Sequence, residues 1–231
     1  MKREFRSAVT DVMIVLLCGA LLITVLIGVA ERRAVVPIHS SPYIVIDAGH
    51  GGADGGAVAA DGTEEKFLNL AVAQCLRDLL AVMGFRVGMT RTDDVMIATE
   101  GTSLRERKVS DMRNRLARIE EADLAISIHQ NKFPQTQYHG AQVFYSVNHA
   151  DSRVLAESVR TQIITLVQPE NTRALKTGDS SVFLLHRTTR PMILVECGFL
   201  SNTGELEKLK SSAYQQSIAF AIAAGTVTMG G

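Results

Sequence analysis

Tryptophan is missing from the 231 residues of this sequence, and aromatic side chains make up only 5% of it. A stacking platform for single-stranded nucleic acid, which needs repeated aromatic rings, is therefore not expected. An excess of either charge is missing too, because 24 basic residues balance 24 acidic ones. No strong electrostatic field attracts nucleic acid, and we predict no nucleic-acid partner.

Cysteine is scarce, with three residues at Cys18, Cys75 and Cys197. An even-numbered disulfide framework is therefore absent, and buried free thiols are the expected state. Cys197 follows an apolar run, a position that also suits a nucleophile, but no histidine or asparagine stands at a spacing that supports this role. We do not predict a cysteine-dependent enzyme.

The N-terminal region contains an apolar run long enough to cross a membrane. No charged residue occurs between Val12 and Ala30, and about 20 apolar residues in a helix span the hydrocarbon core of a bilayer. A secretory signal usually has a shorter apolar region of about 7–15 residues, although Gly28 and Ala30 suit a cleavage site. We therefore expect residues 1–33 to form a short cytoplasmic tip with a membrane anchor, or alternatively a cleaved signal.

Either alternative exports the rest of the chain. Lys2, Arg3 and Arg6 favour an N-terminus that stays in the cytoplasm, although the basic pair at 32–33 weakens this bias. The predicted location is thus a membrane-anchored protein with an extracytoplasmic domain, or a secreted protein if the segment is removed. Residues 34–42, with two prolines and two serines, are predicted to be a linker. The remaining residues, 43–231, are predicted to form one catalytic domain.

Beyond the linker, apolar runs and helical patterns alternate. This alternation predicts an α/β fold with a twisted, mostly parallel sheet of about six strands flanked by helices. The runs at 43–47, 124–128 and 192–196 are continuously apolar, as in strands that are covered on both faces. The other expected strands are 85–90, 141–146 and 181–185, and the expected helices are 64–83, 103–122, 152–167 and one or two within 204–229.

Chemically active side chains follow the three most apolar strands. "YIVIDAGH" ends in His50, "LAISIHQN" contains His129, and "MILVECGF" contains Glu196. In open α/β sheets, ligands bind outside the carboxyl ends of the strands, so these side chains should converge on one cleft. Taken singly, each histidine is more often a hydrogen-bonded loop residue and the glutamate a surface group. The three together favour a shared site.

Two imidazoles and a carboxylate are the ligand set of many catalytic zinc sites. A further carboxylate is available from Glu64 or Glu65, because both lie in the first turn of the predicted helix 64–83. Helical geometry does not choose between them, and the alternative interpretation is that these acids at the start of the helix face water. Asp47 or Ser127 is a candidate to orient a ligand imidazole, and Asp47 is equally interpretable as a turn residue.

Four segments together resemble the zinc-dependent N-acetylmuramoyl-L-alanine amidases of the amidase-3 type. They are "VIDAGHGGADGGA", "EEKFLNLA", "SIHQNKF" with "HGAQVFY", and "ILVECGFLSN", and the likeness covers about residues 43–226. The resemblance implies that His50, Glu65 and His129 bind Zn²⁺, since the acid directly before Lys66 matches the family's ligand. It also implies that Glu196 is the catalytic glutamate.

The implied reaction is hydrolysis of the amide bond between N-acetylmuramic acid and the L-alanine of the peptidoglycan stem peptide. Within the family, the short form with one N-terminal apolar segment is similar to the spore-cortex amidases, which act in cortex maturation and germination together with a partner deacetylase. A vegetative cell-wall amidase is the alternative. Two further alternatives are another zinc peptidase on the same fold and a degenerate protein that only binds the wall or a partner.

Overall fold

The computed structural model describes residues 41–228, which contain a single mixed sheet of six strands. The strand order is β2-β1-β3-β6-β4-β5. Only the pairing of β4 with β6 is antiparallel, and the other four neighbouring pairs are parallel. The strands are β1 Tyr43–Ala48, β2 Arg86–Met89, β3 Leu124–Asn131, β4 Gln142–Tyr145, β5 Lys176–Thr177 and β6 Met192–Phe199.

Six helices flank this sheet within the described residues, and local sequence explains where several begin or end. Ser103 starts α3 with a capping box, in which its hydroxyl accepts from the Glu106 N–H and the Glu106 side chain accepts from the Ser103 N–H. Gly84, with φ +93°, follows the last turn of α2. The helices are α2 Glu65–Val82, α3 Leu104–Glu120, α4 Ala150–Leu166, α5 Phe183–Arg187, α6 Thr203–Lys210 and α7 Ser212–Thr228.

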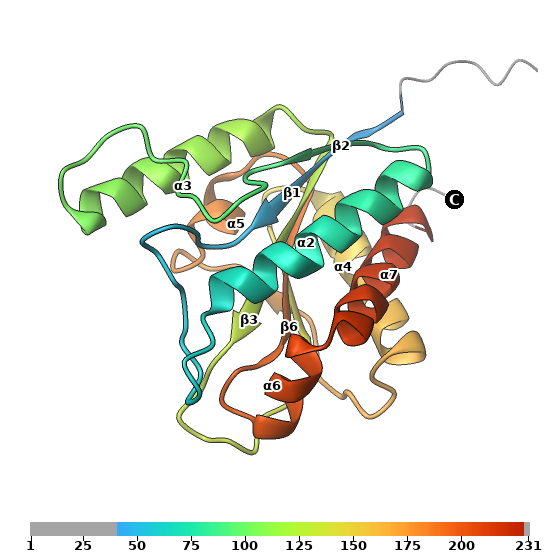
Figure 1. The fold of residues 1–231 in the computed structure, drawn as a ribbon. Coiled ribbons are helices and arrows are strands. Elements are labelled where there is room, and N and C mark those ends of the chain that lie inside the picture. The colour runs from blue at the N-terminus through green and yellow to red at the C-terminus, as the bar shows by residue number, and fades with distance from the viewer. Residues whose placement is uncertain (1–40, 229–231) are drawn as a thin grey trace, which may run out of the picture. The chain divides into compact units, whose positions relative to one another are not determined.

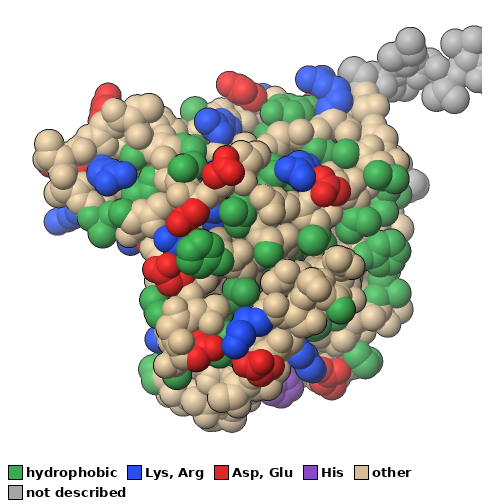
Figure 2. All heavy atoms as spheres, viewed as in Figure 1, with side chains coloured by type: hydrophobic (Ala, Val, Ile, Leu, Met, Phe, Trp, Pro, Cys, Tyr) green, Lys and Arg blue, Asp and Glu red, His purple; other side chains and the backbone are tan. Residues whose placement is uncertain are grey.

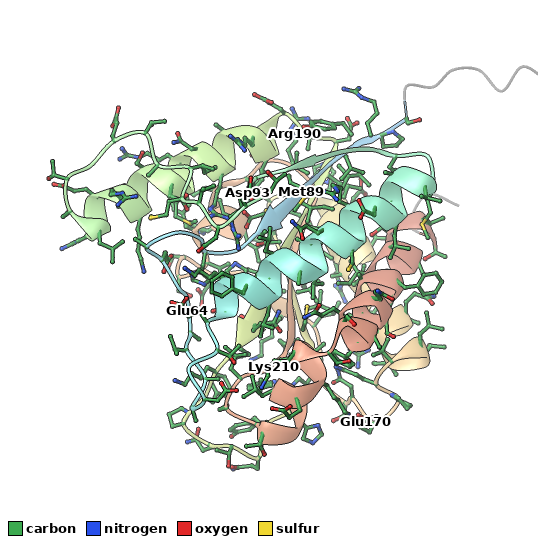
Figure 3. The ribbon with its side chains drawn as sticks, in the orientation of Figure 1. Glu64, Met89, Asp93, Glu170, Arg190 and Lys210 are labelled. Carbon is green, nitrogen blue, oxygen red and sulfur yellow. The ribbon has the colours of Figure 1, made fainter. Side chains whose placement is uncertain are left out.

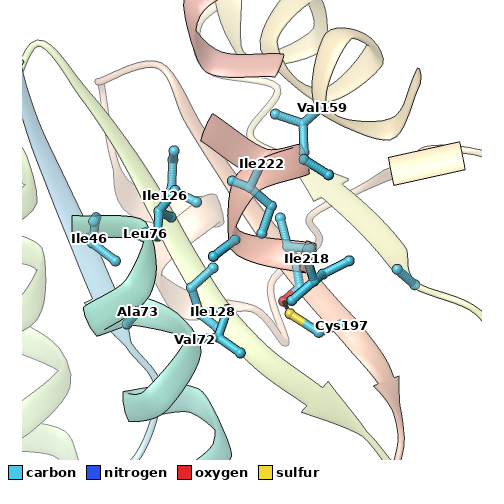
Figure 4. Close-up of a cluster of buried hydrophobic side chains, with 14 of the residues drawn as sticks. Ile46, Val72, Ala73, Leu76, Ile126, Ile128, Val159, Cys197, Ile218 and Ile222 are labelled. Carbon is cyan, nitrogen blue, oxygen red and sulfur yellow. Dashed lines mark hydrogen bonds between the residues drawn. The ribbon is translucent and has the colours of Figure 1, made fainter. Parts of the chain in front are cut away.

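The two faces of the sheet carry two separate hydrophobic clusters. On one face, α2, α4 and α7 pack on side chains such as Ile46, Ile126 and Val195, and Figure 1 shows α2 and α7 side by side there. Figure 4 shows Leu76 of α2 and Ile222 of α7 meeting the strands in this cluster. On the opposite face, the alternate residues of the same strands pack against α3 and α5. The central strands are thus covered on both sides, as their apolar runs predicted.

The predicted α/β architecture and the six-stranded, mostly parallel sheet are confirmed. The prediction of a strand at 181–185 is wrong, because residues 183–187 form the helix α5 and the edge strand β5 lies earlier. An apolar run this short does not distinguish a strand from a helical turn. The predicted strand 192–196 is too short, because β6 continues to Phe199 and Glu196 therefore lies inside it.

The expected membrane anchor or signal segment, residues 1–33, and most of the expected linker lie outside the described residues. Among the helices of residues 41–228, none has the length and apolar character needed to cross a bilayer.

Candidate metal centre

His50 lies just beyond the end of β1 in a left-handed backbone conformation, with φ +63°. Residues with a side chain adopt this conformation at a cost of roughly 1–2 kcal/mol, so the surrounding contacts must hold it. Asp54 Oδ2 lies 2.9 Å from His50 Nδ1, and Glu65 Oε2 lies 3.3 Å from His50 Nε2. Asp54 thereby holds the imidazole through Nδ1, and Nε2 remains directed at Glu65.

Glu65 is the first residue of α2, and the residue is 3% exposed. Its Oε1 accepts from the backbone N–H of Gln130 and lies 3.0 Å from His129 Nδ1, whereas its Oε2 accepts from the Ala57 N–H. Glu64 occupies the N-cap position of α2, where Figure 3 labels it, and its half-buried side chain pairs with Lys66. The structure therefore brings Glu65, and not Glu64, to the two histidines.

His129 and Glu196 lie on the neighbouring strands β3 and β6 and are partners in the register. Side chains at paired positions point to the same face of a sheet, about 5 Å apart at the backbone. Glu196 Oε2 is buried and makes no hydrogen bond. Burial, together with the nearby Glu65 charge, raises the pKa of Glu196 to about 7, although the two histidines oppose this shift. A carboxyl group with this pKa can exchange a proton near neutral pH.

Asn69, one helical turn after Glu65, connects the three segments that carry the histidines and Glu65. Its amide donates to Glu65 Oε1 and to the Gly49 carbonyl, each at 3.1 Å, and its oxygen accepts from Gln130 Nε2 at 3.2 Å. The Asn69 side chain is fully buried. Gly49 directly precedes His50, and Gln130 directly follows His129. Through these neighbours and Glu65, Asn69 fixes the relative positions of the two histidines and Glu65.

Asp47 and Ser127, predicted as candidates to orient an imidazole, do not contact a histidine. Ser127 donates to Asp47 Oδ2, and Asp47 Oδ1 accepts from Arg115 Nη1 at 2.7 Å. Burial raises the pKa of Asp47, but the Arg115 charge and these hydrogen bonds outweigh it and lower the pKa to about 2. The prediction for these two residues is therefore wrong, because Asp54 holds His50 instead.

Arg115 belongs to α3, and its side chain is fully buried. Its guanidinium donates to the carbonyl of Ala48 at 2.7 Å and to that of His50 at 2.6 Å. Arg91 donates to the carbonyls of Ala48 and Gly49. The two arginines thus donate hydrogen bonds to the backbone carbonyls of residues 48–50, where β1 ends, and hold His50 in its left-handed conformation.

Glycines leave room for the ligand side chains in two places. A Cβ atom at Gly49 would lie 2.3 Å from the His129 ring. At Gly56, with φ +69°, a Cβ atom would lie 2.6 Å from both Glu65 Oε2 and the His50 ring. The glycine-rich stretch after β1 therefore lets the imidazoles and the carboxylate approach one another closely.

The donor set fits a zinc ion. Within residues 41–228, His50, Glu65 and His129 form the one group whose ligand atoms all lie within 4.8 Å of one another. His129 Nδ1 lies 3.0 Å from Glu65 Oε1, and His50 Nε2 lies 3.3 Å from Glu65 Oε2. Both imidazoles therefore reach the Glu65 carboxylate, and histidine nitrogens with a carboxylate oxygen are ligands that zinc binds. The burial of Glu65 would raise its pKa, but both histidines lower it, so the carboxylate is ionised.

Cys197 is not a reactive thiol of the candidate metal site. Its thiol is buried in the core cluster beneath α2 and α7 (Figure 4). Burial raises the pKa of this thiol to about 12, which leaves almost no thiolate at neutral pH. This agrees with the expectation that no cysteine nucleophile operates here.

Fold and side chains together define a class of α/β protein that presents two histidines and two glutamates at one end of a mixed sheet. Residues 44–227 match the Amidase_3 family, described as N-acetylmuramoyl-L-alanine amidase. The chain belongs to this family, whose members are hydrolases that act on peptidoglycan. The expectations of the family, of the α/β fold of the domain and of the reaction are confirmed.

Individual relatives agree with this assignment. The germination-specific N-acetylmuramoyl-L-alanine amidase of Bacillus subtilis is 38% identical over 189 residues, covering 80% of this chain and 78% of the relative. The CwlD amidase of Clostridioides difficile, solved in complex with the GerS lipoprotein, is 37% identical with a TM-score of 0.79 and covers 82% and 98% of the two chains. An N-acetylmuramoyl-L-alanine amidase of Clostridium difficile 630 is 28% identical with a TM-score of 0.72, covering 81% and 96%.

Proposed function

We propose that this amidase holds one zinc ion with His50, Glu65 and His129, and that Glu196 moves the proton in hydrolysis. The observation that carries the proposal is the meeting of a compact His-Glu-His group with a buried carboxylate oxygen that has no partner. When bound, zinc supplies Lewis acidity to the substrate carbonyl and to the attacking water.

Glu196 acts first as a base and then as an acid. It removes a proton from the attacking water and returns it to the nitrogen of the leaving L-alanine, so that the muramoyl–alanine amide bond breaks. With no metal bound, burial raises the pKa of Glu196 to about 7, and its unpartnered Oε2 leaves one carboxyl oxygen free to take up and release a proton. Asp54 and Asn69 keep the imidazoles and Glu65 in place meanwhile.

The ligand set is tested by the zinc content of His129→Ala. Purified protein is analysed by elemental mass spectrometry, and the variant should carry well below one zinc per chain. His139→Ala, which alters an exposed histidine in the loop between β3 and β4, is the matched control and should keep the wild-type content. Full zinc retention in His129→Ala would overturn the ligand set.

The biological setting that we propose is the spore cortex. It is supported by the likeness to a germination-specific amidase and to CwlD. The vegetative alternative has support from LytC of Bacillus subtilis, which is 31% identical, although this chain covers only 35% of that protein. Mass spectrometry of cortex fragments from a strain lacking the protein decides between them. Loss of muramic δ-lactam supports the cortex role, and an unchanged cortex contradicts it.

We further propose that the apolar run between Val12 and Ala30 anchors the enzyme to the membrane with its catalytic domain outside the cytoplasm. A deacetylase would act on the product, and a lipoprotein partner is suggested by the complex of CwlD with GerS. Fractionation tests the anchor, because the protein should sediment with membranes and be released by detergent but not by high salt. Recovery in the soluble fraction would favour a cleaved signal.

A further inference from the structure

A groove of about 540 Å³ lies between the first turns of α3 and the start of α5. Its walls combine exposed apolar side chains with positive charge. Leu104, Val109 and Phe183 are 46%, 47% and 36% exposed. In Figure 2, hydrophobic and basic side chains adjoin each other over the projecting α3. The apolar wall is completed by Met112, and the three cations of the lining are Arg105, Lys108 and Arg113.

The groove opens on the same face of the sheet as the catalytic side chains. Met192 and Leu194 of β6 belong to the cluster beneath α3 and α5, and Glu196 continues this alternate row of side chains. The groove is also connected to the metal site. Lys108 Nζ lies 2.7 Å from Asp54 Oδ1, and the other oxygen of Asp54 contacts His50.

The charge of the groove favours an anionic ligand. α3 carries six basic and three acidic residues. Within the described part of the chain, neither Arg105 nor Arg113 forms an ion pair. Both guanidiniums also border a neighbouring depression that contains Glu100 and Glu106, but the Glu106 carboxylate is occupied by the N–H groups of residues 102 and 103. Two guanidiniums therefore remain available to a carboxylate.

We propose that this groove binds the peptide arm of the substrate and that Arg105 and Arg113 recognise its carboxylate. The proposal rests on the amidase function above, because a stem peptide attached through its amino end carries a free carboxylate at its other end. Three residues of extended peptide reach about 10 Å, and Arg105 lies one helical turn, about 4.5 Å, beyond Lys108.

The test uses two soluble substrates, N-acetylmuramoyl-L-alanyl tripeptides that end in a free carboxylate or in a carboxamide. The zinc-loaded full-length enzyme is compared with the double variant Arg105→Gln/Arg113→Gln. Loss of charge-assisted hydrogen bonds should raise KM for the free acid by about 10-fold or more. The value of kcat should change less than about 2-fold, and KM for the carboxamide should stay near that of the wild type.

Arg153→Gln is the control, because Arg153 is an exposed arginine on α4, outside the groove. It should leave both KM values unchanged. An unchanged KM for the free acid in the double variant overturns the proposal, and so does an equal rise for both substrates. A fall in kcat alone would mean that α3 acts through the metal site and also overturns it.

Binding of the two tripeptides to Glu196→Gln, with and without the arginine changes, is measured by calorimetry. A selective loss of affinity for the free acid supports the groove even if the wild-type enzyme cleaves neither compound. Failure of cleavage would refute the proposed function instead. Equal affinities in both arginine backgrounds would refute the groove.

Discussion

Replacing Asn69 with alanine should weaken zinc binding much more than replacing another buried asparagine would. The change removes two donated hydrogen bonds, to Glu65 Oε1 and the Gly49 carbonyl, and one accepted from Gln130. The Gly49 carbonyl keeps its bond from Arg91, and Glu65 keeps its bond from the Gln130 N–H. The side-chain amide of Gln130, in contrast, loses the acceptor of the hydrogen bond that its nitrogen donates to Asn69.

Two magnitudes follow from this geometry. A buried amide left without a partner costs about 1–3 kcal/mol in the free energy of unfolding. Zinc affinity should fall by about 10–100-fold, as is typical when a group that orients a metal ligand is lost. Affinity is measured by competition with a chromophoric chelator, and the visible spectrum of the Co²⁺-substituted protein reports whether the ligand geometry has changed.

Asn171→Ala is the matched control. Asn171 is also buried, and its side chain makes three hydrogen bonds, to the Ala141 carbonyl, the Gln168 side chain and the Arg173 N–H. Its loss should lower stability similarly but leave zinc affinity and the Co²⁺ spectrum unchanged. If both variants lose zinc affinity equally, or if Asn69→Ala loses none, then Asn69 does not position the metal ligands.

Two further predictions concern protons and charge. Burial lowers the pKa of His50, but Asp54 and Glu65 outweigh this effect and raise the pKa to about 9 without metal. Zinc must displace the proton of this imidazole in order to bind. The affinity of the protein for zinc should therefore rise about tenfold per pH unit from pH 7 to 9. Calorimetry in buffers of different ionisation enthalpy should find about one proton released per zinc at pH 7.5, and none released would contradict the assigned contacts. Arg115→Met leaves Asp47 and Asp111 buried without their cation and should lower the free energy of unfolding by about 3–5 kcal/mol in denaturant titrations. A loss below about 1 kcal/mol would show that other groups compensate.

Most of the architecture was predictable because the signals were local and periodic. β1, β3 and β6 begin at the predicted residues, and Ser103 caps α3 at the predicted start, although β3 and β6 each continue three residues further than predicted. The short segment after β5 was mispredicted because its apolar residues suit either a strand or a helical turn. The end of β6 was misplaced because Cys197 and Phe199 extend the strand past a charged residue.

Some residues of the candidate site could likewise be predicted from the sequence, and others could not. His50, His129 and Glu196 could be predicted to converge because each belongs to an apolar strand or directly follows one, whereas the choice of Glu65 required the family resemblance. Asp54 stands four residues after His50, a spacing that could have suggested a partner, but it lies in a loop without periodicity. Asn69, Lys108 and Arg115 act across elements distant in sequence. No local pattern encodes such contacts.

The most direct test of the account is Glu196→Gln, which replaces the buried carboxyl with an amide of nearly the same shape. The variant should bind one zinc per chain with wild-type affinity, because Glu196 is not among the proposed ligands. Digested peptidoglycan should then release almost no stem peptides that begin with L-alanine, as measured by mass spectrometry. Wild-type release by a zinc-loaded Glu196→Gln enzyme would contradict the central claim that this carboxyl moves the proton.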